Sequence, residues 1–139
     1  MTNSFLFDAN SILLLFRELD ERALDVLLIG STIPLVYYEI GNALWKECFL
    51  LKRIDVEKVA RLLSSIFIII RKMDLIRLEE EEHGTATLNV AGSLNITYYD
   101  ASYLAAAREF RRTLVTDDEK LIVAAKKLGV RTVESTTFH

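Results

Sequence analysis

Four acidic residues, far apart in the 139-residue chain, occupy positions where carboxylates could meet after folding. Asp8 and Asp118 each follow a short apolar run and precede a helical pattern, and Asp100 lies in the first turn of a predicted helix. Glu39 lies inside a predicted helix among apolar and aromatic neighbours. Strand-to-helix turns gather at the carboxyl ends of the strands in open parallel sheets, where ligands bind. We therefore expect these four carboxylates to form one site.

Carboxylates gathered in this way repel one another unless they are protonated or bind a cation. Two unit charges about 4 Å apart cost on the order of 4 kcal/mol at an effective dielectric near 20. Oxygen ligands without a histidine or cysteine partner select Mg²⁺ or Mn²⁺ rather than zinc. Such ions can generate hydroxide and clamp the oxygens of a phosphodiester during in-line displacement. The predicted chemistry is metal-dependent hydrolysis.

Each acid also has a purely structural interpretation. Asp8 could be only a helix N-cap, and Asp100 could belong to an imperfect capping box with Thr97. Asp117 and Asp118 could be first-turn acids that complement a helix dipole. Glu39 could face solvent on the polar side of its helix. No capping role explains Glu39, however, and a carboxylate among apolar neighbours is costly unless something pairs with it.

Short apolar runs alternate with longer amphipathic runs, which is typical of an α/β fold with a mainly parallel sheet. The last helix is expected to open with a capping box of Thr116 and Glu119, and the first with a cap from Asn10 or Ser11. The apolar residues 66–70, at the end of the predicted helix 56–70, could instead form a buried turn or a strand. The expected strands are 4–7, 31–36, 75–78, 113–116 and 131–133. The expected helices are 12–17, 21–29, 37–51, 56–70, 80–94, 98–111 and 117–128.

Length and composition favour one domain, residues 1–139. Apolar residues make up 51% of the chain, so part of this surface is expected in an oligomer interface. The single cysteine, Cys48, excludes an internal disulfide. The N-terminus lacks a basic leader, and the apolar stretch 27–45 is broken by Gly30 and Pro34, so we expect a cytoplasmic protein with no membrane segment.

A formal net charge of −3 counts against simple coating of duplex nucleic acid, which favours basic proteins. It counts less against a nuclease, because bound divalent cations reverse the sign of the local field. Arg108 and Arg111, on the helix after Asp100, are candidate contacts for substrate phosphates. Solvated helix faces, or pairing with nearby acids, explain most such basic residues better than phosphate binding does.

At these positions the sequence resembles the PIN-domain family, most closely the VapC-type toxins of prokaryotic toxin–antitoxin pairs. The resemblance covers essentially the whole chain, and the four motifs occur in the family's order and spacing. They are LFDANSIL (6–13) with Asp8 and Asn10, PLVYYEIGNAL (34–44) with Glu39, TYYDASYLAAA (97–107) with Asp100, and LVTDDEKLIVAAKKLGV (114–130) with Thr116 and Asp118.

The resemblance implies an α/β/α three-layer sandwich and a Mg²⁺- or Mn²⁺-dependent endoribonuclease. It also implies a homodimer that is neutralised by a VapB-type antitoxin. Asp8, Glu39 and Asp100 would bind the principal ion directly or through water, and Asp118 would complete the site or hold a second ion. Asn10 and Thr116 would orient carboxylates or waters. The doublet Asp117-Asp118 departs from the family pattern, so Asp117 is an alternative fourth acid.

Two other functions compete with this interpretation. A catalytically weak or inactive PIN-like module that binds RNA or protein would be expected to lose acidic positions, and here all four are filled. A phosphoacceptor domain of the receiver type requires paired acids after its first strand, which the sequence Asp8-Ala9-Asn10 does not provide. Asn10 also excludes a phosphatase of the Asp-x-Asp type.

Overall fold

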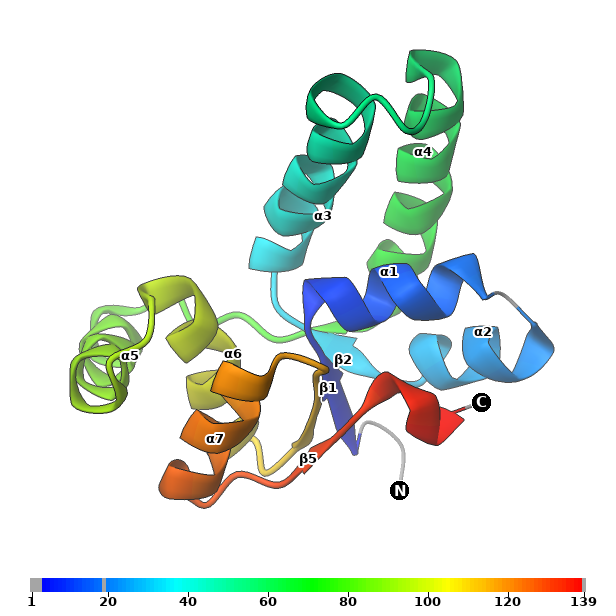
Figure 1. The fold of residues 1–139 in the computed structure, drawn as a ribbon. Coiled ribbons are helices and arrows are strands. Elements are labelled where there is room, and N and C mark those ends of the chain that lie inside the picture. Colours follow the sequence, from blue (N-terminus) through cyan, green and yellow to red (C-terminus); the bar gives the residue numbers. More distant parts are fainter. Residues whose placement is uncertain (1–3, 19, 139) are drawn as a thin grey trace.

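Five short parallel strands form the centre of the computed structural model, which describes residues 4–18 and 20–138 (Figure 1). They run in the order β3-β2-β1-β4-β5. Leu6 of the central strand lies opposite Ser31 on one side and Leu114 on the other. The strands are β1 (Phe5–Phe7), β2 (Ser31–Thr32), β3 (Asp74–Leu75), β4 (Thr113–Val115) and β5 (Thr132–Val133). The α/β prediction with a parallel sheet is confirmed.

Helices connect every pair of consecutive strands. The connection from β1 to β2 holds α1 (Ala9–Arg17) and α2 (Glu21–Leu28). The connection from β2 to β3 holds α3 (Leu35–Trp45), its π-helical extension η1 (Lys46–Leu50) and α4 (Val56–Lys72). The connection from β3 to β4 holds α5 (Glu81–Leu94) and α6 (Tyr98–Glu109). Helix α7 (Glu119–Leu128) leads to β5, and a 3₁₀ turn, η2 (Ser135–Phe138), follows.

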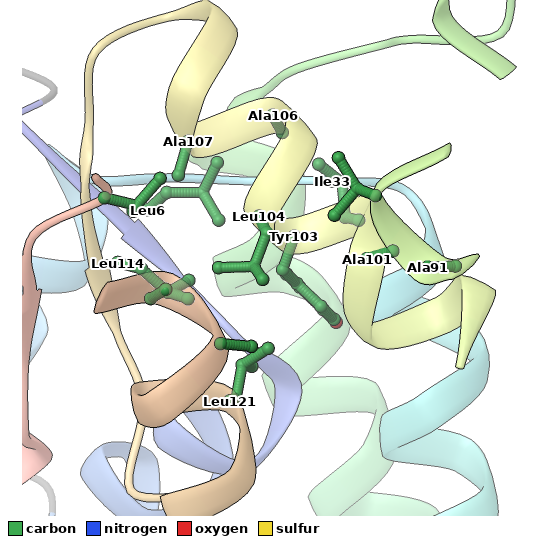
Figure 2. Close-up of a cluster of buried hydrophobic side chains, with 14 of the residues drawn as sticks. Leu6, Ile33, Ala91, Ala101, Tyr103, Leu104, Ala106, Ala107, Leu114 and Leu121 are labelled. Atoms are coloured by element: carbon green, nitrogen blue, oxygen red, sulfur yellow. The ribbon is translucent and has the colours of Figure 1, made fainter. Parts of the chain in front are cut away.

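The central strand divides the core into two layers, because successive side chains of a strand point to opposite faces. Leu6 is fully buried on one face of the sheet. It belongs to the same apolar cluster as Leu114, Leu104 of α6 and Leu121 of α7 (Figure 2). Phe7, the next residue, is fully buried on the other face among residues of α1, α2, α3 and α4. Helices therefore cover both faces of the sheet, and the expected three-layer α/β/α arrangement is confirmed.

Strand β2 is shorter than expected, because the chain turns into α3 directly after it. The backbone nitrogen of Pro34 carries no hydrogen for a ladder bond, and the residue already has helical backbone angles. Side chains supplement the short ladder. The buried hydroxyls of Ser31 and Thr32 donate to the carbonyls of Phe5 and Phe7, at 2.6 and 2.8 Å.

Three local predictions are corrected. The N-cap of α1 is Asp8, which agrees with one of the two interpretations of that residue, and not Asn10 or Ser11, because the Asp8 carboxylate accepts from the Ser11 amide at 2.9 Å. The N-cap of α7 is Asp118 and not Thr116. The apolar tail at 66–70 is neither a turn nor a strand, since α4 continues through it to Lys72.

The order of the strands creates a point where the connections change direction. From β1 the chain moves outward through β2 to β3, and then returns across the sheet to β4 on the other side of β1. Ligand sites in open α/β sheets lie at such a point, just beyond the carboxyl ends of the two strands. Asp8 directly follows β1, and Thr116, Asp117 and Asp118 directly follow β4.

Helices α3 and α4 pack side by side and extend away from the sheet (Figure 1). Several large apolar side chains remain about half exposed near the end of this pair. They are Trp45, Phe49, Leu50, Leu51 and Val56.

Within the described ranges, no helix is both long and apolar enough to cross a membrane.

The close approach of Gly30 to Phe7 yields a test of the core. A Cβ at residue 30 would lie 2.9 Å from Cδ2 of the Phe7 ring and closer still to Cε2. The ring cannot move away easily, because it is fully buried and packs against Phe138 with ring centroids 5.8 Å apart. We predict that Gly30→Ala lowers the free energy of unfolding by about 1–3 kcal/mol, measured by urea denaturation.

Gly92→Ala is the matched control. Gly92 lies in α5, is exposed, and has open space where a Cβ would be placed. Alanine there should raise stability by about 0.5–1 kcal/mol, because glycine is a poor helix former. Equal effects of the two substitutions would contradict the packing described for Phe7.

Candidate functional site

The carboxyl ends of β1 and β4 are joined by hydrogen bonds that fix the first acid. The Asp8 amide donates to the Val115 carbonyl at 3.2 Å, and the buried Ser11 hydroxyl donates to the same carbonyl at 3.1 Å. The Asp8 carboxylate is itself buried, and it caps α1. Its position therefore follows from the register of the two central strands and the start of one helix.

One pocket of about 330 Å³ collects every acid singled out in the sequence. Among the residues that the structure describes, no lysine, arginine or histidine lines this pocket. Asn10, Tyr103 of α6, and apolar residues of α1, α3 and α7 form the rest of the wall. The acids come from four separate segments: Asp8, Glu39, Asp100, Asp117 and Asp118. We refer to this hollow as the acidic pocket.

Burial and mutual repulsion raise the pKa of three of these acids. For Asp8 the main cause is burial, and Asp117 adds repulsion, while hydrogen bonds from Thr116 and Ser11 act in the opposite direction. The pKa of Glu39 rises through burial and then through the charges of Asp100 and Asp8.

The pKa of Asp100 rises for the same reasons, burial first and then the charge of Asp118. A hydrogen bond from Thr97, and then the charge of Lys120, which lies outside the pocket lining, act in the opposite direction. The acids therefore form one electrostatically coupled group.

The doublet at 117 and 118 divides into two different environments. Both carboxylate oxygens of Asp117 accept hydrogen bonds from Ser135, one from the amide at 2.8 Å and one from the hydroxyl at 2.6 Å. Asp118 uses only Oδ1, which accepts from the amides of Lys120 and Leu121 as the cap of α7. This arrangement favours Asp118 as the fourth acid, since its other oxygen makes no hydrogen bond within the described ranges.

Thr116 lies between two of the acids. It is fully buried, its side chain hydrogen-bonds to Asp8, and its Oγ1 accepts from the Asp118 amide at 3.2 Å. Asn10 is exposed at the rim of the same pocket. Both residues therefore lie beside the acids whose orientation the family resemblance assigns to them.

Tyr103 is a site residue that the sequence reasoning missed. Its hydroxyl donates to Oε1 of Glu39 at 2.6 Å, and its ring is buried in the core below α6 (Figure 2). The missed signal was its spacing from Asp100, because residues three apart share one face of a helix. Tyr103 explains how a half-buried carboxylate at 39 is held.

The arginines suggested as phosphate contacts lie elsewhere. Arg108 and Arg111 line a separate hollow with Arg112 and Arg131, beside the amino end of β4. None of the residues of that hollow lines the acidic pocket. Asp100 lies in the first turn of α6 and Arg108 in its last turn, so the helix itself separates them.

The donor set of the acidic pocket fits a hard divalent cation. Carboxylate oxygens are the ligands that Mg²⁺ and Mn²⁺ prefer, and a cation would relieve the repulsion that raises the pKa values. Among the residues that the structure describes, however, no three acids, histidines or cysteines come close enough to hold one ion. An ion here would therefore keep several waters, as Mg²⁺ usually does in proteins.

Comparison with known proteins gives one curated relative and several similar structures. No protein-family model matches the chain. Exonuclease VapC9 of Pyrobaculum aerophilum is 35% identical over 105 residues, which is 76% of this chain and 72% of that protein. The crystal structure of PAE2754 from Pyrobaculum aerophilum has a TM-score of 0.79 at 27% identity, covering 99% of this chain and 94% of its own.

Two more distant structures share the fold. A toxin–antitoxin complex from Klebsiella pneumoniae has a TM-score of 0.64 at 16% identity, covering 95% of this chain and 98% of that one. The structure of FitAB bound to an IR36 DNA fragment has a TM-score of 0.63 at 16% identity, covering 97% and 96%.

The raised pKa values predict how the stability of the metal-free protein depends on pH. The folded state holds protons on Asp8, Glu39 and Asp100 more tightly than the unfolded chain does. Their contribution to stability is full below the ordinary carboxyl pKa and is lost as the pH rises through the folded values. We predict that Asp8→Asn, which keeps the capping oxygen, raises the free energy of unfolding in EDTA at pH 7.5 by on the order of 1 kcal/mol.

This gain should shrink as the pH is lowered towards 4, and urea denaturation at several pH values measures it. Asp55→Asn is the matched control, because Asp55 is an exposed cap that accepts from the Lys58 amide at 2.9 Å on α4, outside the acidic pocket. A loss of stability in Asp8→Asn at every pH would show that the acid is a structural cap only.

Proposed function

Because the chain belongs to the VapC-type group of the PIN-domain family, we propose that it is a divalent-metal-dependent endoribonuclease. The observation that carries this proposal is the gathering of Asp8, Glu39, Asp100 and Asp118 around one pocket, whose lining within the described part of the chain contains no cationic side chain. A purely structural group of acids would be expected to pair with lysine or arginine, or to disperse. The name of the relative, an exonuclease, supports nuclease activity in general.

Asp8, Glu39 and Asp100 are the proposed holders of the ion, directly or through water, and Asp118 completes the set. When bound, a Mg²⁺ or Mn²⁺ ion would supply positive charge to the phosphate oxygens and lower the pKa of a bound water. The chain's own contribution is orientation. Thr116 fixes Asp8 relative to the start of α7, and Tyr103 holds Oε1 of Glu39.

We further propose that the protein is the toxin of a VapBC-type pair, acting in the cytoplasm as a homodimer of single-domain chains. The exposed apolar side chains of η1 and the following turn, Phe49, Leu50 and Leu51, are 45–57% exposed and suit a protein partner. A VapB-type antitoxin would cover or enter the acidic pocket. An upstream reading frame for a small DNA-binding protein, if found beside the gene, would support this role.

A second candidate function is a PIN-like module with weak or no catalysis, which binds RNA or protein. The spacing of the acids favours it, because no three of them in the described ranges close around a single ion. The two functions differ in whether the pocket acids affect turnover, so one assay separates them.

The assay compares cleavage of a structured linear RNA and of a circular single-stranded RNA, with Mn²⁺, with Mg²⁺ and with EDTA. We expect metal-dependent cleavage of both substrates, since a circle has no end for an exonuclease. Asp8→Ala and Asp100→Ala should each lower the rate on the order of 100-fold or more, since even the outer partners of metal ligands typically contribute 10–100-fold.

Asp55→Ala, which removes a helix cap away from the pocket, is the control and should retain activity. Cleavage in EDTA, or wild-type rates in both pocket variants, would contradict the proposed mechanism. Cleavage of the linear RNA alone would assign exonuclease activity instead.

A further inference from the structure

A second hollow, the tyrosine groove, opens beside the acidic pocket between α3 and the start of α6. Its volume is about 500 Å³. Tyr38, Asn42 and Lys46 follow one another at intervals of four residues and therefore line one side of α3 and its extension. The lining consists of Leu35, Tyr38, Glu39, Asn42, Ala43, Lys46 and Tyr99.

The tyrosine groove is continuous with the acidic pocket, because Glu39 and Ala43 line both. Each tyrosine directly precedes a pocket acid in the sequence, Tyr38 before Glu39 and Tyr99 before Asp100. Consecutive helical residues point about 100° apart, so an acid that faces the pocket places the preceding side chain beside it. A polymer with one phosphate in the acidic pocket would extend along this groove.

The two tyrosine rings are unusually accessible, with Tyr38 78% and Tyr99 60% exposed. Rings in these positions contribute little to the core, and no aromatic partner packs against them among the described residues. An exposed aromatic face next to a nuclease pocket suits the stacking of an unpaired base, which tolerates any sequence. Bases in a duplex are already stacked and cannot use it.

The polar residues of the groove fit a nucleotide as well. Lys46 is exposed and pairs with no carboxylate in the described part of the chain, so its ammonium group is available to a phosphate. Asn42, also exposed, offers both a donor and an acceptor to the edge of a base. The single lysine agrees with a binding mode based on stacking, whereas an acidic protein cannot rely on charge alone.

We propose that the tyrosine groove binds unpaired nucleotides of single-stranded RNA next to the scissile phosphate, with bases stacked on Tyr38 and Tyr99. This inference rests on the proposed nuclease function, and it assigns two residues, Tyr38 and Tyr99, to contact with the nucleotides beside the cleavage site.

Fluorescence anisotropy of the full chain tests the proposal, with a labelled single-stranded 12-nucleotide RNA and a hairpin duplex of the same composition. Ca²⁺ replaces Mg²⁺ or Mn²⁺ because it takes the same oxygen ligands. The wild type should bind the single strand more tightly than the duplex. Tyr38→Ala and Tyr99→Ala should each weaken this binding roughly five- to tenfold, at the lower end of the stacking range.

Tyr38→Phe and Tyr99→Phe keep the aromatic face and should stay within about twofold of the wild type. Phe110→Ala is the matched control, because Phe110 is a similarly exposed ring at the opposite end of α6. In cleavage assays the alanine variants should raise KM with little change in kcat.

The outcomes separate the two proposals. Binding that depends on the tyrosines without any cleavage by the wild type would leave the groove in place and overturn the nuclease function. Cleavage by the wild type with unchanged RNA affinity in Tyr38→Ala and Tyr99→Ala would overturn the groove alone. If Tyr99→Ala converts a dimer to a monomer in light scattering while RNA affinity is unchanged, the face belongs to self-association and the groove proposal fails.

Discussion

Repulsion among carboxylates at the carboxyl ends of β1 and β4 is the constraint on which the rest of the structure depends. Burial and neighbouring charge both raise the pKa of Asp8, Glu39 and Asp100, so the ionised site opposes folding near neutral pH. The fold must hold these groups in place despite that cost. It does so with rigid elements on every side: two paired strands, the capped starts of α1 and α7, and a tyrosine that anchors the acid on α3.

The parallel sheet supplies this rigidity although its strands have only two or three residues each. The side-chain hydroxyls of Ser31 and Thr32 donate hydrogen bonds to carbonyls of β1. At the site itself, the Ser11 hydroxyl donates to the Val115 carbonyl, and the Thr116 hydroxyl accepts from the Asp118 amide. Leu6 and Phe7, fully buried on opposite faces of β1, then pack against the helices of the two layers. The residues that hold the core and those that hold the acids are neighbours in sequence, which ties the stability of the fold to the geometry of the pocket.

Much of this organisation could be predicted from the sequence, because helix periodicity and strand-to-helix turns are local signals. The alternation of elements, the α/β class and the segments that carry the acids all follow from such signals. The roles of Tyr103 and Ser135 could not, since each depends on a contact with a residue more than 15 positions away. The continuation of α4 through residues 66–70 was also ambiguous, because a short β-branched run suits a strand or a buried helix equally well. The placement of Arg108 and Arg111 in another hollow shows how a helix separates charges that are close in sequence.

The most direct test of the account is the thermal stability of the metal-free protein during titration with Mn²⁺. A cation that relieves the repulsion must bind the folded state, and at a hundred times its Kd it should add about 2.7 kcal/mol of stability. We therefore expect a saturable rise in Tm for the wild type. Asp8→Asn should start from a higher Tm and lose most of that rise. An unchanged wild-type Tm at millimolar Mn²⁺, or an equal rise in Asp8→Asn, would contradict the claim that these carboxylates form a cation site.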